Sequence, residues 1–194
     1  MQRLILDAMG GDHAPGAIIE GAVLALSEYE DISIHLVGDE AAIAAELAKY
    51  DVDQSRILIT HTTQVIAMDE APVQAVRQKK DSSLVVGMNL LAQGEGDAFV
   101  TAGSTGATTA GGTLLVRRAK NVERPALAPI LPTTKGGVLL IDCGANVDCR
   151  ASHLQQFGVM GSIYMQAVEG VSRPRVGLIN NGAEEEKGNS LTKE

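Results

Sequence analysis

The repeated order of apolar strand, glycine-bearing loop and helix is the feature that most restricts the fold of this chain. Short apolar or alternating runs predict strands, and amphipathic runs between them predict helices. The predicted strands are residues 3–7, 32–37, 56–60, 97–101, 138–142 and 175–180. The predicted helices are residues 18–29, 39–50, 72–80, 82–91, 107–116 and 152–168. This alternation is typical of an α/β protein with a mostly parallel sheet covered by helices on both faces.

The core of such a sheet has to be built from small aliphatic residues. Hydrophobic residues make up 45% of the chain and aromatic residues only 3%, while glycine occurs 21 times. Glycine lets helices pack closely on a sheet and lets backbone approach a ligand. The proline-dense segment 124–132 is expected to be an extended connection. A further helix is predicted to begin within residues 188–194, and the sequence ends within about two turns of its start. We therefore expect residues 1–194 to be the N-terminal portion of a single, C-terminally truncated domain.

Charge and motif content argue against several classes of protein. The net charge of −8 disfavours a sequence-independent nucleic-acid binder. Cys143 and Cys149 form neither a disulfide framework nor a zinc spacing, which fits a cytoplasmic protein without a metal. No apolar run is long enough to span a bilayer, and the N-terminus does not resemble a signal peptide. The P-loop and dinucleotide-binding motifs are also missing.

Four polar loops with glycine follow predicted strands. They are residues 7–13, 101–106, 142–148 and 180–189. In open α/β sheets, ligands bind at the carboxyl ends of strands, where small residues let backbone N–H groups reach an anion. Each loop alone is more simply explained as a turn. Together the four favour a shared anion site.

Few side chains in these loops can act as acids, bases or cations. His13 lies in a glycine loop and is a candidate acid or base. Cys143 is a possible nucleophile, although a small buried cysteine often acts only as an apolar residue. Lys187 either is a solvated loop lysine or holds phosphate or an oxyanion.

Basic residues cluster after two predicted helices. They favour either simple charge compensation at helix C-termini or a docking patch for an acidic partner. The predicted docking residues are Arg77, Lys79, Lys80, Arg117, Arg118 and Arg124.

The order of these motifs resembles that of the bacterial phosphate acyltransferases of phospholipid synthesis. The resemblance runs through all 194 residues. The similar segments are residues 7–15, 36–39, 102–107, 123–129, 142–148 and 187–189. Two differences stand out, since the family has Asn where this chain has Ser104, and its members are considerably longer.

The resemblance implies both a fold and a reaction. The fold is a three-layer α/β/α sandwich similar to phosphotransacetylases and isocitrate dehydrogenases, in a protein that is usually a homodimer. The reaction moves a long-chain acyl group from acyl carrier protein to inorganic phosphate, with no cofactor, metal or nucleotide. A coenzyme A-dependent phosphotransacetylase and an inactive carrier-protein-binding fragment are the alternatives. We expect a cytoplasmic protein that can associate peripherally with the inner face of the membrane.

Under this interpretation Lys187 is the main catalytic residue, and His13 is a second acid–base candidate. Phosphate attacks the thioester directly, without an acyl-enzyme. The predicted phosphate- and substrate-binding residues are Gly10, Gly11, Asp12, Gly103, Ser104, Thr105, Gly106, Asn146, Asn180 and Asn189.

Overall fold

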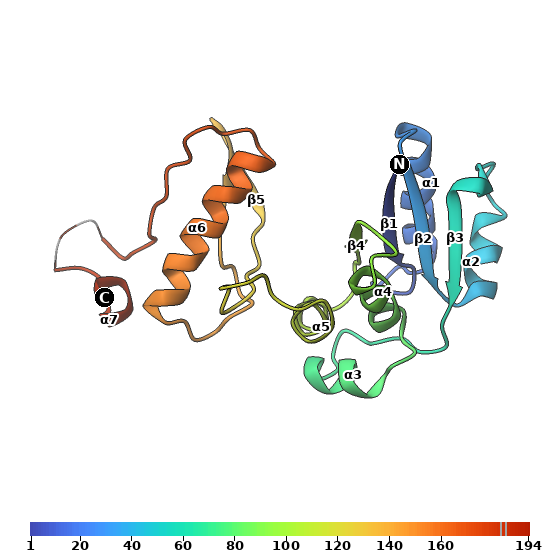
Figure 1. Ribbon diagram of the computed structural model, residues 1–194, viewed down its shortest axis with the longest axis horizontal. Coiled ribbons are helices and arrows are strands. Elements are labelled where there is room, and N and C mark those ends of the chain that lie inside the picture. Colours follow the sequence, from blue (N-terminus) through green and yellow to red (C-terminus); the bar gives the residue numbers. More distant parts are fainter. Residues whose placement is uncertain (183, 185) are drawn as a thin grey trace. The chain divides into compact units, whose positions relative to one another are not determined.

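The computed structural model describes residues 1–182, 184 and 186–194. The chain divides into two compact units, Met1–Arg117 (unit 1) and Arg118–Glu194 (unit 2). Each unit has its own sheet (Figure 1). No helix in the described residues is long and apolar enough to cross a membrane.

Unit 1 contains the parallel sheet that the sequence predicts. Its strand order is β3-β2-β1-β4, and every neighbouring pair is parallel. The strands are β1 (Gln2–Asp7), β2 (Ile32–Gly38), β3 (Ile57–His61) and β4 (Ala98–Val100). The helical elements of unit 1 are α1 (Gly16–Glu28), α2 (Glu40–Leu47), η1 (Gln54–Arg56), α3 (Pro72–Gln78), α4 (Ser83–Ala92), α5 (Thr105–Gly111) and η2 (Gly112–Val116). The expected α/β fold is confirmed.

Helices cover both faces of this sheet. On one face, α1 and α2 contribute Ile19, Leu26 and Ile43 to a core shared with β2, whose Ile34 and Leu36 are also buried. Burying an aliphatic side chain of this size stabilises the fold by about 1.5–3 kcal/mol. On the other face lies α4, which belongs to a second apolar cluster with α3 and the start of α5.

Glycine allows α4 to approach the sheet closely. A Cβ on Gly87 would lie 2.5 Å from the Phe99 ring on β4 and 3.3 Å from Ile5 on β1. No side chain fits there without moving the helix away from the strands. The composition thus predicts this use of glycine correctly.

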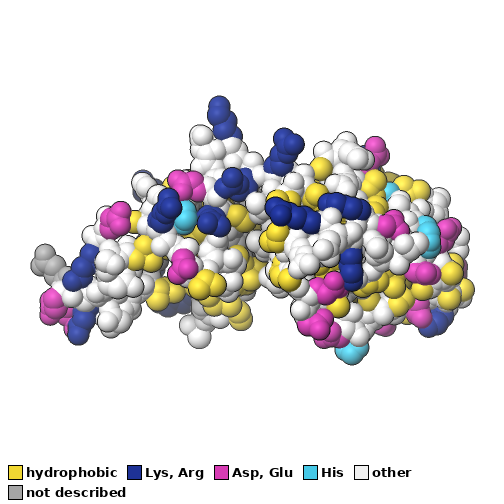
Figure 2. All heavy atoms as spheres, turned by 90° about the horizontal axis from the view of Figure 1, so that it is seen from below, with side chains coloured by type: hydrophobic (Ala, Val, Ile, Leu, Met, Phe, Trp, Pro, Cys, Tyr) yellow, Lys and Arg dark blue, Asp and Glu magenta, His cyan; other side chains and the backbone are white. Residues whose placement is uncertain are grey.

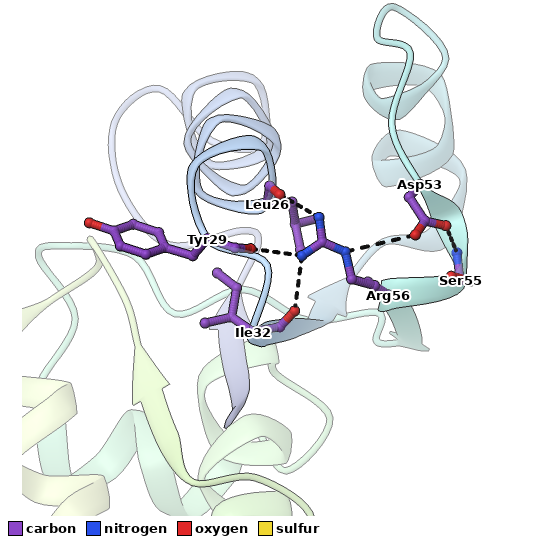
Figure 3. Close-up of polar contacts among 6 residues, drawn as sticks. All are labelled: Leu26, Tyr29, Ile32, Asp53, Ser55 and Arg56. Carbon is purple, nitrogen blue, oxygen red and sulfur yellow. Dashed lines mark hydrogen bonds and ion pairs between the residues drawn. The ribbon is translucent and has the colours of Figure 1, made fainter. Parts of the chain in front are cut away.

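Arg56 fastens the end of α1 to the beginning of β2. Its guanidinium donates hydrogen bonds to the carbonyl oxygens of Leu26, Tyr29 and Ile32, the last two at 2.8 and 3.4 Å (Figure 3). Asp53 lies on the other side of the same group, 3.8 Å from Nε. Carbonyls at the end of a helix have no intrahelical donors, so Arg56 provides them.

Unit 2 differs from the sequence prediction in its strands. β5 (Ile130–Thr133) and β6 (Gly136–Leu139) form an antiparallel hairpin. The sequence predicts a parallel strand over 138–142 and an extended connection over 124–132, and both predictions are wrong in part. Gly136 at φ +109° closes a tight turn, and this turn pairs residues 130–133 with residues 136–139. The predicted strand over 175–180 is also absent from the described residues.

The long helix of unit 2 is predicted nearly to the residue. It is α6 (Ala151–Ala167), and it packs on the hairpin where Gly161 approaches Leu139. His153 accepts a hydrogen bond from the Arg150 N–H through Nδ1 at 3.2 Å and so caps the start of this helix. A short last helix, α7 (Ser190–Lys193), follows.

Candidate active site

Two of the predicted loops meet at the carboxyl edge of the unit 1 sheet. Residues 7–13 follow β1 and residues 101–106 follow β4, and these two strands are neighbours. A Cβ on Gly11 would lie 3.0 Å from the Ala102 carbonyl oxygen, and one on Gly103 would lie 3.3 Å from the Gly10 Cα. The structure therefore brings Gly10 and Gly11 together with Gly103, as expected for a shared site.

The loop after β4 uses several of its polar groups internally. Ser104 is 7% exposed, and its hydroxyl caps α5 by accepting the Ala107 N–H at 3.3 Å. Asn, which the resemblance implies at this position, caps helices as well as Ser does. Ser104 in its place therefore keeps a helix cap. The Gly103 N–H donates to the Thr101 hydroxyl at 3.0 Å and is not open to a ligand.

Two backbone donors in that loop remain available. Within the described residues, the N–H groups of Thr105 and Gly106 have no protein acceptor. They belong to the first turn of α5, where N–H groups have no intrahelical partner. Gly106 also lies against α3, since a Cβ there would be 2.7 Å from Pro72 Cγ.

Asp12 and His13 lie on the surface of the loop after β1. Asp12 does not cap α1, since this helix begins at Gly16 after Pro15 and has no side-chain cap. The exposed position of His13 keeps its imidazole accessible to a ligand. Its role as an acid or base stays a prediction.

In unit 2, Asp142 organises the third predicted loop. Its carboxylate accepts hydrogen bonds from the N–H groups of Leu127, Ala145 and Asn146 at 2.8, 3.2 and 2.8 Å. Burial alone would raise the pKa of Asp142, but these bonds and one from the Asn146 side chain outweigh it and hold the pKa below its ordinary value. Asn146 Nδ2 also donates to the Pro125 carbonyl at 2.8 Å. The Asn146 side chain, which the sequence predicts to bind the ligand, is therefore engaged within the fold.

The fourth loop contains Lys187, and positions 183 and 185 of this loop lie outside the described residues. Lys187 is exposed, and its Cγ would be 2.6 Å from a Cβ on Gly182. Asn180 approaches Gly188, whose Cβ would lie 2.9 Å from Asn180 Nδ2. Asn189 accepts the Thr192 N–H at 3.1 Å as the cap of α7. Lys187 and Asn180 thus belong to one compact loop within unit 2.

The predicted docking residues differ in what their charges contact. Lys79 is half-buried, and its ammonium binds Glu70 at 2.6 Å and the Val65 carbonyl at 2.7 Å. This hydrogen bond is the main cause that lowers the pKa of Glu70. Arg77 and Lys80 are exposed, and Arg77 lines an open depression of about 520 Å³ on α3. On the face shown in Figure 2, several Lys and Arg side chains lie next to hydrophobic ones.

The remaining docking residues lie at or just after the point in the sequence where unit 1 ends and unit 2 begins. Arg117 has φ +75°, and Arg118 donates to the Glu123 carbonyl. Arg124 is exposed.

Asp7 and Thr101 are polar residues that the sequence interpretation left out of the site. Both lie in the loops it singled out, but their contact depends on the pairing of β1 with β4, which no local pattern reveals.

Comparison with known proteins gives consistent matches. Residues 2–194 match the family described as "Fatty acid synthesis protein". A phosphate acyltransferase of Clostridium beijerinckii is 50% identical over 98% of this chain and 57% of its own length. One from Thermoanaerobacter pseudethanolicus is 51% identical over 98% of this chain and 56% of its own length. The chain therefore spans a little over half the length of these curated relatives.

Two solved structures share the fold. A phosphotransacetylase from Staphylococcus aureus aligns with a TM-score of 0.60 and 18% identity, over 84% of this chain and 52% of that one. A phosphotransacetylase from Streptococcus pyogenes aligns with a TM-score of 0.63 and 16% identity, over 88% and 55%. At this identity the likeness establishes the fold alone.

Proposed function

Because the chain belongs to the fatty acid synthesis protein family, we propose that the complete protein is a phosphate acyltransferase. It transfers a long-chain acyl group from acyl carrier protein to inorganic phosphate and releases the carrier thiol. The observation that carries this proposal is that the family match covers both glycine loops of unit 1 and the Lys187 loop. Curated relatives at about half identity bear the name of this activity.

The reaction needs positioning more than covalent chemistry. The thioester is already activated, and a phosphate oxygen is a competent nucleophile once it is held near the carbonyl carbon. Attack forms a tetrahedral oxyanion, which collapses with departure of the carrier thiolate to give the acyl phosphate. Orienting two reactants in this way can supply up to roughly 7–11 kcal/mol of the barrier.

Backbone groups of unit 1 provide the anion-binding part of the proposed site. The N–H groups of Thr105 and Gly106 are free of protein acceptors in the described part of the chain. Gly11 lies against the same loop, since a Cβ there would be 3.0 Å from the Ala102 carbonyl oxygen. Asp12 follows Gly11 on the surface, and Ser104 caps the helix. An N–H pair of this kind stabilises phosphate oxygens or an oxyanion.

Lys187 is the proposed cation of the reaction. Lys187 would orient phosphate and balance its charge during attack, with Asn180 and Asn189 in the same loop as further donors. Asn146 would support its loop through the Pro125 contact. His13 is the second-choice acid or base.

The partner and setting of the protein are part of the same proposal. The proposed carrier-protein docking residues are Arg77, Lys80 and Arg117 in unit 1 and Arg118 and Arg124 in unit 2, with Lys79 in a supporting role through Glu70. Both units would belong to one domain of a homodimeric cytoplasmic enzyme that associates peripherally with the membrane. No cofactor takes part in the proposed reaction.

The acyl donor distinguishes this function from that of a phosphotransacetylase. The full-length protein is incubated with phosphate and either acyl carrier protein loaded with a long acyl chain or acyl-coenzyme A of the same chain. Mass spectrometry should detect acyl phosphate mainly with the carrier protein. Preference for coenzyme A, or binding of the carrier protein without turnover, would contradict the proposal.

A further inference from the structure

A buried carboxylate connects the two glycine loops of unit 1. Asp7, the last residue of β1, is 2% exposed. Its Oδ2 accepts a hydrogen bond from the Thr101 hydroxyl at 2.8 Å, and its Oδ1 accepts one from the Met9 N–H at 3.2 Å. Asp7 and Thr101 are 94 residues apart in the sequence, yet they follow the paired strands β1 and β4.

Thr101 extends this contact to the backbone of the second loop. An amide N–H only donates a hydrogen bond, whereas a hydroxyl can donate one and accept others. The Thr101 hydroxyl accepts the Gly103 N–H at 3.0 Å and donates its own proton to Asp7 Oδ2. Carboxylate, hydroxyl and amide form one continuous chain from the loop after β1 to the loop after β4.

The glycine backbone lies directly over this chain. A Cβ on Gly10 would be 2.5 Å from Asp7 Oδ2 and 2.7 Å from Thr101 Oγ1. One on Gly103 would be 3.2 Å from Thr101 Oγ1 and 3.3 Å from the Gly10 Cα. The loops can come this close only because neither residue has a side chain.

The burial of Asp7 calls for a role. A buried polar group is costly unless it is hydrogen-bonded, and the Met9 N–H and the Thr101 hydroxyl each satisfy one oxygen of the Asp7 carboxyl group. Loss of the Thr101 hydroxyl would leave Oδ2 buried without that donor. The Thr101 contact is therefore a link between the loops that is costly to break.

We propose that Asp7 and Thr101 are positioning residues that hold the two glycine loops in the geometry that receives phosphate. Neither side chain touches the anion, because the Gly10 and Gly103 backbone lies over them. The inference rests on the proposed function for its ligand. The link itself is independent of that function and can be measured separately.

The first test compares Thr101→Val with Thr101→Ser in the full-length protein. Valine keeps the shape but removes the hydroxyl, and serine restores it. We expect Thr101→Val to raise KM for inorganic phosphate by about tenfold or more. KM for the acyl carrier protein should change by less than about threefold, and Thr101→Ser should have a KM for phosphate near that of the unmutated protein. Equal KM values for phosphate in the valine and serine variants would overturn the inference.

A second measurement does not depend on turnover. Amide hydrogen exchange should be faster over residues 7–13 and 101–106 in Thr101→Val, and unchanged in Thr101→Ser. If Thr101→Val does not fold, Asp7→Asn decides, because the two bonds go to different oxygens and the carboxamide has an NH2 group in place of one of them. Unchanged exchange in both loops would overturn the link. Absence of acyl phosphate with the unmutated protein would instead overturn the proposed function.

Discussion

Lys187 is the residue on which the proposed chemistry depends most. It is an exposed residue in a loop with Gly182 and Gly188. We expect Lys187→Ala to lower acyl-phosphate formation by about 10²-fold or more, the size of effect seen when a transition-state donor is removed. The melting temperature should stay the same.

The control for this variant is Lys135→Ala, which removes an exposed lysine from the β5–β6 turn. Its turnover should equal that of the unmutated protein. Near-normal turnover in Lys187→Ala would remove Lys187 from the mechanism.

Cys143 tests whether the acyl group passes through the protein. Its backbone N–H donates to the Leu127 carbonyl at 3.1 Å, and its thiol is free. Direct attack by phosphate predicts that Cys143→Ala keeps substantial activity and that mass spectrometry finds no acyl-cysteine when phosphate is withheld. Trapping such an adduct would replace direct attack with nucleophilic catalysis.

At the scale of elements, Arg56 joins α1, β2 and η1 through three carbonyl contacts and one ion pair. We expect Arg56→Met to lower the free energy of unfolding by about 1–3 kcal/mol, since carbonyls that were bound to a charged donor lose it. Urea denaturation measures the change. Arg3→Met is the control, because the ion pair of Arg3 with Asp97 is about half exposed and should contribute less than about 1 kcal/mol. Equal losses in the two variants would contradict the role of Arg56.

Helix α3 carries the part of the docking surface that can be tested most simply. Arg77 and Lys80 are exposed, although Lys80 Nζ donates to the Val76 carbonyl at 3.2 Å, and Lys79 pairs with Glu70. The double variant Arg77→Glu/Lys80→Glu should raise KM for acyl carrier protein by about tenfold with little change in kcat, and added salt should reduce the difference. Lys49→Glu, which changes a lysine just after α2 in the same unit, is the control. A KM for acyl carrier protein that changes with neither salt nor charge reversal would argue against docking at these residues.

At the scale of the whole molecule, the sequence predicts unit 1 well and unit 2 less well. Local periodicity is sufficient for β1 to β3 and α6, because each has an apolar pattern of its own. It fails at 138–142, where pairing with the proline-dense segment 130–133 makes an antiparallel hairpin. That pairing is a contact between segments, and periodicity within one segment does not record it.

The same limit applies to the candidate site. Gly10, Gly11 and Gly103 are predicted from their places after strands, and the structure brings them together. Asp7 and Thr101 were missed because the order β3-β2-β1-β4 puts the first strand beside the fourth. Convergence of the unit 2 loops on the same anion stays a prediction.

The central claim is that inorganic phosphate itself receives the acyl group. The full-length protein is supplied with acyl carrier protein bearing a long-chain acyl group and with phosphate labelled with ¹⁸O at every oxygen. We expect an acyl phosphate whose mass includes every labelled oxygen, formed at the same rate as the released carrier thiol. Release of unlabelled fatty acid, or thiol release at the same rate without phosphate, would contradict it.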